Sequence, residues 1–309
     1  MKKALLIVNP KSGTSAASKD SVIETAQRIL PLSGIELDVA RTERRGHASE
    51  LAAAAAAAGV PVVIAAGGDG TVNETARALC HTDVAMGIIP CGSGNGLARH
   101  LNVPMNTEKA LGVIAAGRTE VIDLCTANGE PFFCTFGMGF DAAVSDRFAS
   151  RPDRRGLRNY VRAAVEVFLR YKSQEYTIST SDGTHTERAF IVACCNASQY
   201  GNNAFIAPRA SLTDGLMDIT IIHRATWLSH AVSGIRIMTG SLSKSGGVSM
   251  IRTSDLHISR PVAGPAHLDG EVARLGKEID VKCHHNALKV FTPGEVKVRP
   301  LLTSLGLKK

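Results

Sequence analysis

A glycine-rich turn that follows a short apolar run most constrains how this chain can fold. Residues 60–74 read VPVVIAAGGDGTVNE, and the run 62–66 is rich in β-branched residues, which is typical of a buried strand. This run leads directly into Gly-Gly-Asp-Gly at 67–70. Glycine contributes no side chain to packing and loses much conformational freedom on folding. Three glycines around one carboxylate therefore predict a turn whose backbone N–H groups approach a ligand closely.

A helix is expected to begin directly after this turn. Thr71 and Glu74 have the spacing of a capping box, which predicts that Thr71 caps the helix. A strand, a glycine turn and a helix N-terminus together bind phosphate well, because unpaired backbone N–H groups and the helix dipole both favour an anion. The alternative is a tight turn of an ordinary α/β protein that binds nothing.

The first 125 residues alternate between predicted strands and predicted helices. Strands are expected at 4–8, 35–41, 62–66 and 85–89, and helices at 18–31, 48–58, from 71 onward and at 107–116. This alternation predicts a Rossmann-like, mainly parallel sheet with helices on both faces. Ligands of such sheets bind at the carboxyl ends of the strands. The loops expected there are 9–13, 42–47, 67–71 and 91–95.

The pattern changes from about residue 121 to short strand-like runs separated by turns. Such runs occupy 119–124, 131–135, 176–181, 189–195, 217–222, 256–259, 278–283 and 288–291, and helical segments are expected at 159–172 and 226–240. This pattern predicts a β-rich second domain over 126–294 with an antiparallel, sandwich-like fold. We expect a cleft between the two domains, and we expect residues 295–309 to return to the nucleotide-binding α/β domain at 1–125.

The chain is basic, with a formal net charge of +7 and a pI of about 9.1, which favours an anionic partner such as a nucleotide, a nucleic acid or an acidic membrane surface. No aromatic platform of the kind that stacks bases is interleaved with the basic residues, so a nucleic-acid partner is not expected. Seven cysteines, an odd number, favour a reducing compartment. Gly59 and Pro61 interrupt the longest charge-free run, and no signal peptide is evident, so we expect a cytoplasmic protein that works on membranes only from their surface.

Five further motifs occur in order along the chain. Asn9-Pro10 precedes GGDGTVNE at 67–74, and P-x-G-S-G-N follows at 90–95. The later motifs are G-x-G-F-D at 137–141, A-P-x-A-S-L-x-D-G-L-x-D at 207–218 and L-D-G-E at 268–271. Together they resemble the catalytic domain shared by diacylglycerol kinases, bacterial soluble lipid kinases and sphingosine kinases. The resemblance covers nearly the whole chain.

This resemblance implies transfer of the γ-phosphoryl group of ATP to a lipid hydroxyl, with Mg²⁺ bound to the phosphates. It also implies that the β-rich domain at 126–294 binds the lipid substrate. It places nucleotide contacts at Asn9, Thr42 and Ser93 and along the glycine turn, at Gly67, Gly68, Asp69, Gly70, Thr71, Val72, Asn73 and Glu74. Asp69 is a natural magnesium ligand and a catalytic candidate. The alternative for Asp69 is an aspartate that only stabilises the turn.

Two more sets of residues receive roles from the resemblance. Glu271 matches the general base that takes the proton of the lipid hydroxyl, although Asp-Gly-Glu at 269–271 is also what an ordinary hairpin turn contains. Ser211, Asp214 and Leu216 match the ligands of a second, structural or regulatory magnesium ion in the soluble bacterial branch. A carboxylate beside main-chain carbonyls suits that hard cation.

The lipid is harder to predict. Residues 42–51 and 92–98 resemble segments of sphingosine kinases, but they belong to the ATP-binding domain. Where sphingosine kinases carry an aspartate that meets the lipid amine, this chain has Ala143, with Asp141 two residues earlier. Diacylglycerol is therefore the expected substrate, and a sphingoid base or phosphatidylglycerol is the alternative.

Other classes of protein fit these motifs less well than a lipid kinase does. An NAD kinase shares the Gly-Gly-Asp-Gly turn but not the 211–216 block or the final Asp-Gly-Glu. A nucleotide- or lipid-sensing protein needs no proton acceptor, so the presence of both Asp69 and Glu271 speaks against it. A Walker-type P-loop is absent, and Gly137-x-Gly139 lacks the second βα unit and downstream acid of a dinucleotide site. For the oligomeric state, a homodimer is the alternative to a monomer.

A basic segment provides a candidate membrane contact. Residues 147–162 hold six arginines, namely Arg147, Arg151, Arg154, Arg155, Arg158 and Arg162. We expect this segment to dock the protein on an anionic leaflet, where each basic residue contributes about 1 kcal/mol. The alternative is a solvated helix face with a few internal salt bridges.

Overall fold

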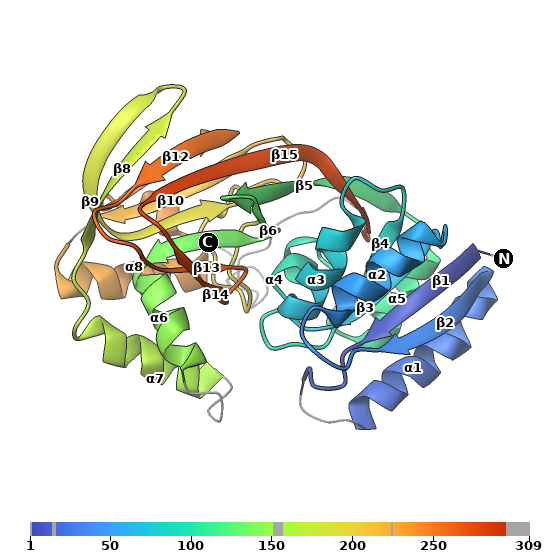
Figure 1. The fold of residues 1–309 in the computed structure, drawn as a ribbon. Coiled ribbons are helices and arrows are strands. Elements are labelled where there is room, and N and C mark those ends of the chain that lie inside the picture. Colours follow the sequence, from blue (N-terminus) through green and yellow to red (C-terminus); the bar gives the residue numbers. More distant parts are fainter. Residues whose placement is uncertain (1, 14–16, 151–156, 224, 295–309) are drawn as a thin grey trace. The chain divides into compact units, whose positions relative to one another are not determined.

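The computed structural model describes residues 2–13, 17–150, 157–223 and 225–294. These residues form two compact units (Figure 1). The first comprises the chain up to Asp123 together with the stretch that begins at Asn286, and the second runs from Leu124 to His285. The expected return of residues 295–309 lies outside the described residues.

The first unit contains a parallel sheet. Its strands are β1 (Lys2–Val8), β2 (Ile35–Arg41), β3 (Val62–Gly67) and β4 (Ala85–Pro90), in the order β4-β3-β1-β2. The end of β15 (Glu278–Phe291) pairs with β4 through Val290 and Met86. Parallel strands need crossover connections, and here the helices between the strands supply them.

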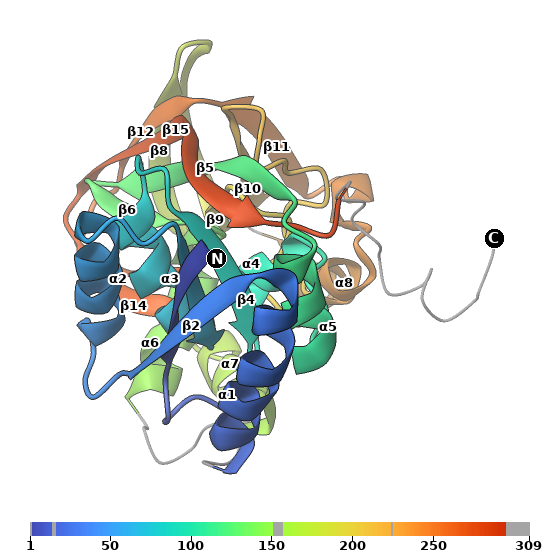
Figure 2. The ribbon, with the colours of Figure 1, turned by 90° about the vertical axis from the view of Figure 1, so that its right-hand side faces the viewer.

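Helices cover this sheet. They are α1 (Ala17–Ile29), η1 (Leu30–Ser33), α2 (His47–Ala57), α3 (Asp69–Leu79), α4 (Gly96–His100) and α5 (Thr107–Ala115). Figure 2 shows α1 and α5 on one side of the strands and α2 and α3 on the other. Val22 and Ala26 of α1 join Leu111 and Ile114 of α5 in one core with alternate residues of the strands. The prediction of a parallel sheet with helices on both faces is confirmed.

The second unit is built from antiparallel strands. They are β5 (Thr119–Ala127), which begins in the first unit, β6 (Glu130–Phe132), β7 (Thr135–Gly139), β8 (Gln174–Thr180), β9 (Gly183–Cys195), β10 (Met217–His223), β11 (Val248–Thr253), β12 (Asp255–Ser259), β13 (Gly264–Leu268), β14 (Glu271–Leu275) and most of β15. β9 pairs with β7, β8 and β10, all antiparallel. The predicted antiparallel, sandwich-like fold is confirmed.

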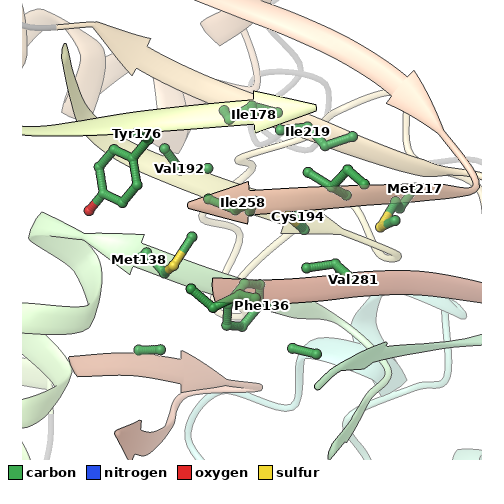
Figure 3. Packing of buried hydrophobic residues seen from close by; sticks show 14 of the residues in the cluster. Phe136, Met138, Tyr176, Ile178, Val192, Cys194, Met217, Ile219, Ile258 and Val281 are labelled. Carbon is green, nitrogen blue, oxygen red and sulfur yellow. The ribbon is translucent and has the colours of Figure 1, made fainter. Parts of the chain in front are cut away.

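Alternate residues of β9 face two different cores, as the period of a strand requires. Val192 and Cys194 face the core between the strands, where Phe136 and Ile219 also lie (Figure 3). Ile191 and Ala193 face a second core that also contains Ile237 of α8. The helices of this unit are α6 (Phe140–Ala149), α7 (Leu157–Phe168), α8 (Trp227–Thr239) and η2 (Leu242–Lys244).

The main departure from the sequence prediction in this unit is α6. It begins directly after β7, within the G-x-G-F-D motif, and no helix was expected there. In the described part of the chain, no helix is both long and apolar enough to cross a bilayer.

Candidate active site

Two glycine-rich loops of the first unit pack backbone against backbone. One follows β3 and the other follows β4, its neighbour in the sheet. A Cβ atom on Gly92 would stand 2.6 Å from the Cα of Gly68, and one on Gly67 would stand 2.4 Å from the Cβ of Thr71. Real Cβ atoms do not approach so closely, so a side chain at either position would clash with its neighbour. Both positions therefore need glycine for lack of space, not for an unusual backbone dihedral angle. The loops therefore form one continuous backbone surface.

The Asp69 carboxylate joins these loops. Its two oxygens accept the backbone N–H groups of Asn95, at 2.9 Å, and Gly96, at 2.7 Å. Those residues lie at the start of α4, where unpaired N–H groups favour an anion. Asp69 therefore holds the second loop in place, as the turn-stabilising alternative predicts. A carboxylate offers about four lone-pair sites, so accepting these two N–H groups does not by itself exclude metal binding.

Thr71 does not cap a helix, contrary to the capping-box prediction. α3 begins at Asp69 with Gly68 as its N-cap, so Thr71 already lies in the first turn. Its hydroxyl accepts a hydrogen bond from the Asn9 side chain at 2.9 Å. The Glu74 carboxylate reaches away from α3 and accepts the backbone N–H groups of Gly46, at 2.8 Å, and Ala48. The spacing is that of a capping box, but both side chains bind neighbouring loops.

The remaining predicted nucleotide residues lie on the loops after β2 and β4 and in the first turns of α3. The backbone N–H of Thr42 donates to the carbonyl of Val8 at 2.9 Å, which places the start of the 42–47 loop beside the end of β1. Ser93 is exposed, Asn73 is half-buried and Val72 is buried. Within the first unit, the structure therefore gathers the carboxyl ends of β1, β2, β3 and β4 as the parallel sheet predicts.

Lys19 was missed by the sequence analysis. It lies in α1 and is only 1% exposed. A Cβ on Gly13 would stand 3.5 Å from its ammonium nitrogen and 2.6 Å from the carbonyl oxygen of Cys91, so the ammonium group lies beside the loops after β1 and β4. No salt bridge found among the described residues involves Lys19. A buried ammonium without a counter-ion is costly, so this position suits an anionic ligand.

In the second unit, Glu271 begins β14 directly after a tight turn. Asp269 and Gly270 form this turn with φ values of +50° and +84°, and Leu268 pairs with Glu271 across it. The Asp269 carboxylate accepts three backbone N–H groups, from Phe133 at 2.9 Å, Cys134 at 2.7 Å and Thr135 at 2.9 Å. The Glu271 side chain is exposed. The hairpin tip is thus fixed to the start of β7, while the candidate base points away from the core.

Arg260 fixes the other end of this hairpin. It is 4% exposed, and its guanidinium donates to the carbonyl oxygens of Gly264, Pro265, Leu275 and Gly276 at 2.7 to 3.2 Å. Burial lowers the pKa of Arg260. Side chain–main chain bonds therefore hold β13 and β14 at both ends and position Glu271 between them.

Asp141, from the G-x-G-F-D motif, lies in a buried polar cluster. Its carboxylate accepts the Tyr200 hydroxyl at 2.8 Å and lies 3.1 Å from Nε2 of His267. A Cβ on Gly137 would stand 2.2 Å from that nitrogen, so this glycine makes room for the pair. The Nδ1 atom of His267 is buried and has no hydrogen-bond partner in the described part of the chain. Asp141 therefore ties α6 to β13, the strand before Glu271.

The predicted second magnesium site is a turn at 211–216. Asp214 Oδ1 accepts the N–H of Leu216 at 3.1 Å, and Ser211 Oγ accepts the N–H of Thr213. Hydroxyl, carboxylate and carbonyl oxygens are the donors that Mg²⁺ prefers. Arg252 lies 3.4 Å from Asp214 Oδ2 and also pairs with Asp218. The donors thus fit magnesium in kind, while a competing cation already shares the carboxylate. Among the described residues, no group of three or more His, Cys, Asp or Glu side chains is placed to hold a metal ion.

Comparisons with known proteins agree with this two-part arrangement. Residues 3–127 match the model of the diacylglycerol kinase catalytic domain, and residues 135–292 match that of the YegS C-terminal NAD kinase beta sandwich-like domain. A diacylglycerol kinase of Mycobacterium tuberculosis is 31% identical over 279 residues, which are 88% of this chain and 89% of that protein. The chain belongs to the diacylglycerol kinase family.

Other relatives of this family member are more distant or differ in length. The uncharacterized protein sll0036 of Synechocystis is 30% identical over 241 residues, covering 75% of this chain and 55% of that protein. The crystal structure of a diacylglycerol kinase from Bacillus anthracis superposes with a TM-score of 0.72 at 19% identity, over 96% of this chain and 98% of that one. At this identity the structural likeness shows the fold. Family membership confirms the predicted class of enzyme, a transferase of the lipid kinase type.

Proposed function

We propose that the chain transfers the γ-phosphoryl group of ATP to the hydroxyl of diacylglycerol. The observation that best supports this proposal is the pair of interlocked glycine loops at the carboxyl ends of β3 and β4, with the buried ammonium of Lys19 beside them. Backbone N–H groups and a desolvated cation at one sheet edge are suited to a polyphosphate. A protein that binds no anion would need neither these backbone N–H groups nor a buried ammonium group at this edge.

The nucleotide would bind along this backbone surface. Asn9, Thr42, Ser93 and residues 67–74 supply amide, hydroxyl and main-chain donors, as the family resemblance implies. Lys19 would neutralise part of the phosphate charge. A magnesium ion bound with ATP would neutralise more of it, with the Asp69 carboxylate as its protein contact.

Glu271 would act as the general base. The lipid oxygen attacks the γ-phosphorus while its proton passes to the Glu271 carboxylate, the bond to the β-phosphate oxygen breaks, and ADP leaves. Asp269 and Arg260 contact neither reactant in this scheme. They position Glu271 through the hairpin. Mg²⁺ at Ser211, Asp214 and Leu216 would be structural, and it would compete with Arg252 for Asp214.

A neutral glycerolipid fits the second unit better than an amine-bearing lipid. Ala143 stands where an amine-binding aspartate is expected, and the Asp141 carboxylate is occupied by Tyr200 and His267. Asp141 is therefore a poor replacement. The enzyme would meet its lipid as a cytoplasmic protein at an anionic membrane surface. The proposed alternatives are a sphingoid base or phosphatidylglycerol as the substrate, or a sensor without activity.

The test is transfer of label from ATP, with magnesium, to micellar diacylglycerol, phosphatidylglycerol, ceramide, sphingosine and dihydrosphingosine. Wild type is compared with Glu271→Gln, and Glu130→Gln, an exposed glutamate of the same unit, is the matched control. We expect labelled diacylglycerol that disappears only in Glu271→Gln. Labelled sphingoid bases would overturn the choice of lipid. ATP binding without any labelled lipid would favour the sensor.

Asp69→Ala would also release the second glycine loop, so the test of magnesium binding at Asp69 uses Asp69→Asn. If Asp69 binds magnesium, Asp69→Asn keeps one hydrogen-bond acceptor and its activity recovers at high magnesium concentration. If Asp69 acts only on the loop, added magnesium has no effect on the variant.

A further inference from the structure

Large apolar side chains gather on the outer faces of two helices of the second unit. The described part of the chain exposes eleven large hydrophobic residues, and seven of them belong to α7, α8 and the turn after α7. These seven are Val161, Val165, Leu169, Leu228, Val232, Ile235 and Met238. Single exposed apolar residues are ordinary, but a group of them marks an interaction site. We call these seven residues the α7–α8 apolar face.

The spacing puts these residues on one stripe of each helix. Val161, Val165 and Leu169 are four residues apart, and Leu228, Val232 and Ile235 are four and three apart. Residues at such spacings lie on one side of a helix. Leu169 is 79% exposed and Ile235 is 64% exposed, so the described residues of the second unit leave both stripes uncovered at these positions.

The opposite sides of the same helices are packed into the protein. Phe168 of α7 meets Phe140 and Phe190 edge-on, and Ile237 of α8 joins the same core. The rings of Phe168 and His230 lie 6.5 Å apart, which places α7 directly beside α8. Both helices therefore already bury one apolar side in the protein. The core of the unit does not need the apolar residues on their outward sides.

The charges near this face are mostly basic. α8 contains Arg236 and no acidic residue, and Arg170 and Lys172 follow α7. The acidic residue of α7 is Glu166, which pairs with Arg147 and Arg162 at 3.0 and 3.2 Å. These two pairs are the internal salt bridges that the alternative reading of the basic segment predicts. Arg151, Arg154 and Arg155 lie outside the described residues, as does the side chain of Arg158.

We infer that the α7–α8 apolar face inserts into the interface of an anionic lipid bilayer. An apolar stripe with basic residues beside it is the composition that lies in a membrane surface, because apolar burial and attraction to anionic lipids act together. A protein partner would need matching acidic and apolar groups, and a second copy of this chain would bring equally basic residues against these. This inference rests on the proposed function, since a kinase of bilayer lipids must reach its substrate at the surface.

The experiment measures co-sedimentation with vesicles in the absence of ATP. Vesicles of phosphatidylcholine with phosphatidylglycerol are compared with phosphatidylcholine alone. The test variant carries Val165→Ser and Ile235→Ser. The matched control carries Leu32→Ser and Val262→Ser, which are 85% and 69% exposed and belong to neither helix. We expect the test variant to bind anionic vesicles about tenfold more weakly, and the control to bind as wild type does.

A second readout separates docking from catalysis. Phosphorylation of detergent-dispersed diacylglycerol needs no bilayer, so the test variant should match wild type there and lose activity only on vesicles. Unchanged vesicle binding of the test variant would overturn the inference. A wild-type protein that is dimeric in solution and becomes monomeric in the test variant would also overturn it, because the face would then be a dimer interface. If wild type binds vesicles through this face but phosphorylates no lipid, the docking surface stands and the proposed function fails.

Discussion

The hairpin that carries Glu271 depends on the Asp269 carboxylate, and Asp269→Ala tests this dependence. The substitution removes the acceptor of three backbone N–H groups, those of Phe133, Cys134 and Thr135. A hydrogen bond to a charged group contributes about 1.5–3 kcal/mol. Oδ1 is shared between two of the donors and the site is half-buried, so the three bonds together are worth about 3–5 kcal/mol rather than their full sum.

Backbone conformation adds to this cost. Asp269 has a φ of +50°, which Asp and Asn tolerate better than Ala does, and the difference is about 1 kcal/mol. Asp269→Asn keeps this conformation and one acceptor oxygen, so it should cost about half as much as Asp269→Ala.

The assay is thermal unfolding followed by tryptophan fluorescence. Trp227 is the only tryptophan in the sequence and belongs to α8, so its signal reports the second unit. At about 2–4 °C per kcal/mol for a domain of this size, Asp269→Ala should lower the midpoint by about 10 °C or more. Asp182→Ala, at an exposed turn of the same unit, should leave it unchanged. An unchanged midpoint in Asp269→Ala would refute the anchoring role.

Further predictions concern the first unit and the other end of the hairpin. Burial lowers the pKa of His100 from 6.5 to about 4, so between these pH values the ring is neutral in the folded unit and protonated in the unfolded chain. The free energy of unfolding should therefore fall by about 3 kcal/mol as the pH is lowered from 6.5 to 4. His100→Gln should reduce this pH dependence in urea titrations followed by circular dichroism. Lys19→Met should weaken ATP binding about 10- to 100-fold by calorimetry without lowering stability, and a less stable variant with normal affinity would contradict the role of Lys19. Gly92→Ala should destabilise the first unit by about 1–3 kcal/mol and reduce ATP affinity, whereas Gly112→Ala, where a Cβ meets nothing within 4 Å, should do neither. Arg260→Met should lower the Trp227 unfolding midpoint by several degrees, because four carbonyl oxygens lose their donor, and a normal midpoint would mean that water replaces it.

Sequence patterns predicted the elements of the first unit well, because its strands are apolar runs bounded by glycine turns and polar loops. β2 (Ile35–Arg41) was predicted with its bounds as observed. The capping role of Thr71 was wrong, because spacing alone does not show whether a side chain turns back on its own helix or toward a neighbouring loop. α6 was missed because its first residues, Phe140 and Asp141, belong to a glycine motif that was read only as a motif.

The parts of the candidate site that the sequence did not reveal depend on side chain–main chain contacts. Arg260 binds carbonyl groups up to 16 residues away, and carbonyl groups leave no trace in a sequence pattern. Lys19 looks like any solvated lysine at the start of a helix, although the fold buries it. Asp269 was noted only as a neighbour of Glu271, because its three donors lie more than 130 residues earlier in the chain.

The two anchors of the β13–β14 hairpin have a consequence for how this enzyme can change over generations. The Asp269 carboxylate accepts hydrogen bonds from backbone N–H groups, and the Arg260 guanidinium donates to backbone carbonyl oxygens. Nearly every residue type supplies these backbone atoms. The side chains at 272–274 belong to neither set of hydrogen bonds, so changing them leaves both anchors of the hairpin in place. A lineage, or a randomised library, can vary them while the Glu271 carboxylate stays where it is.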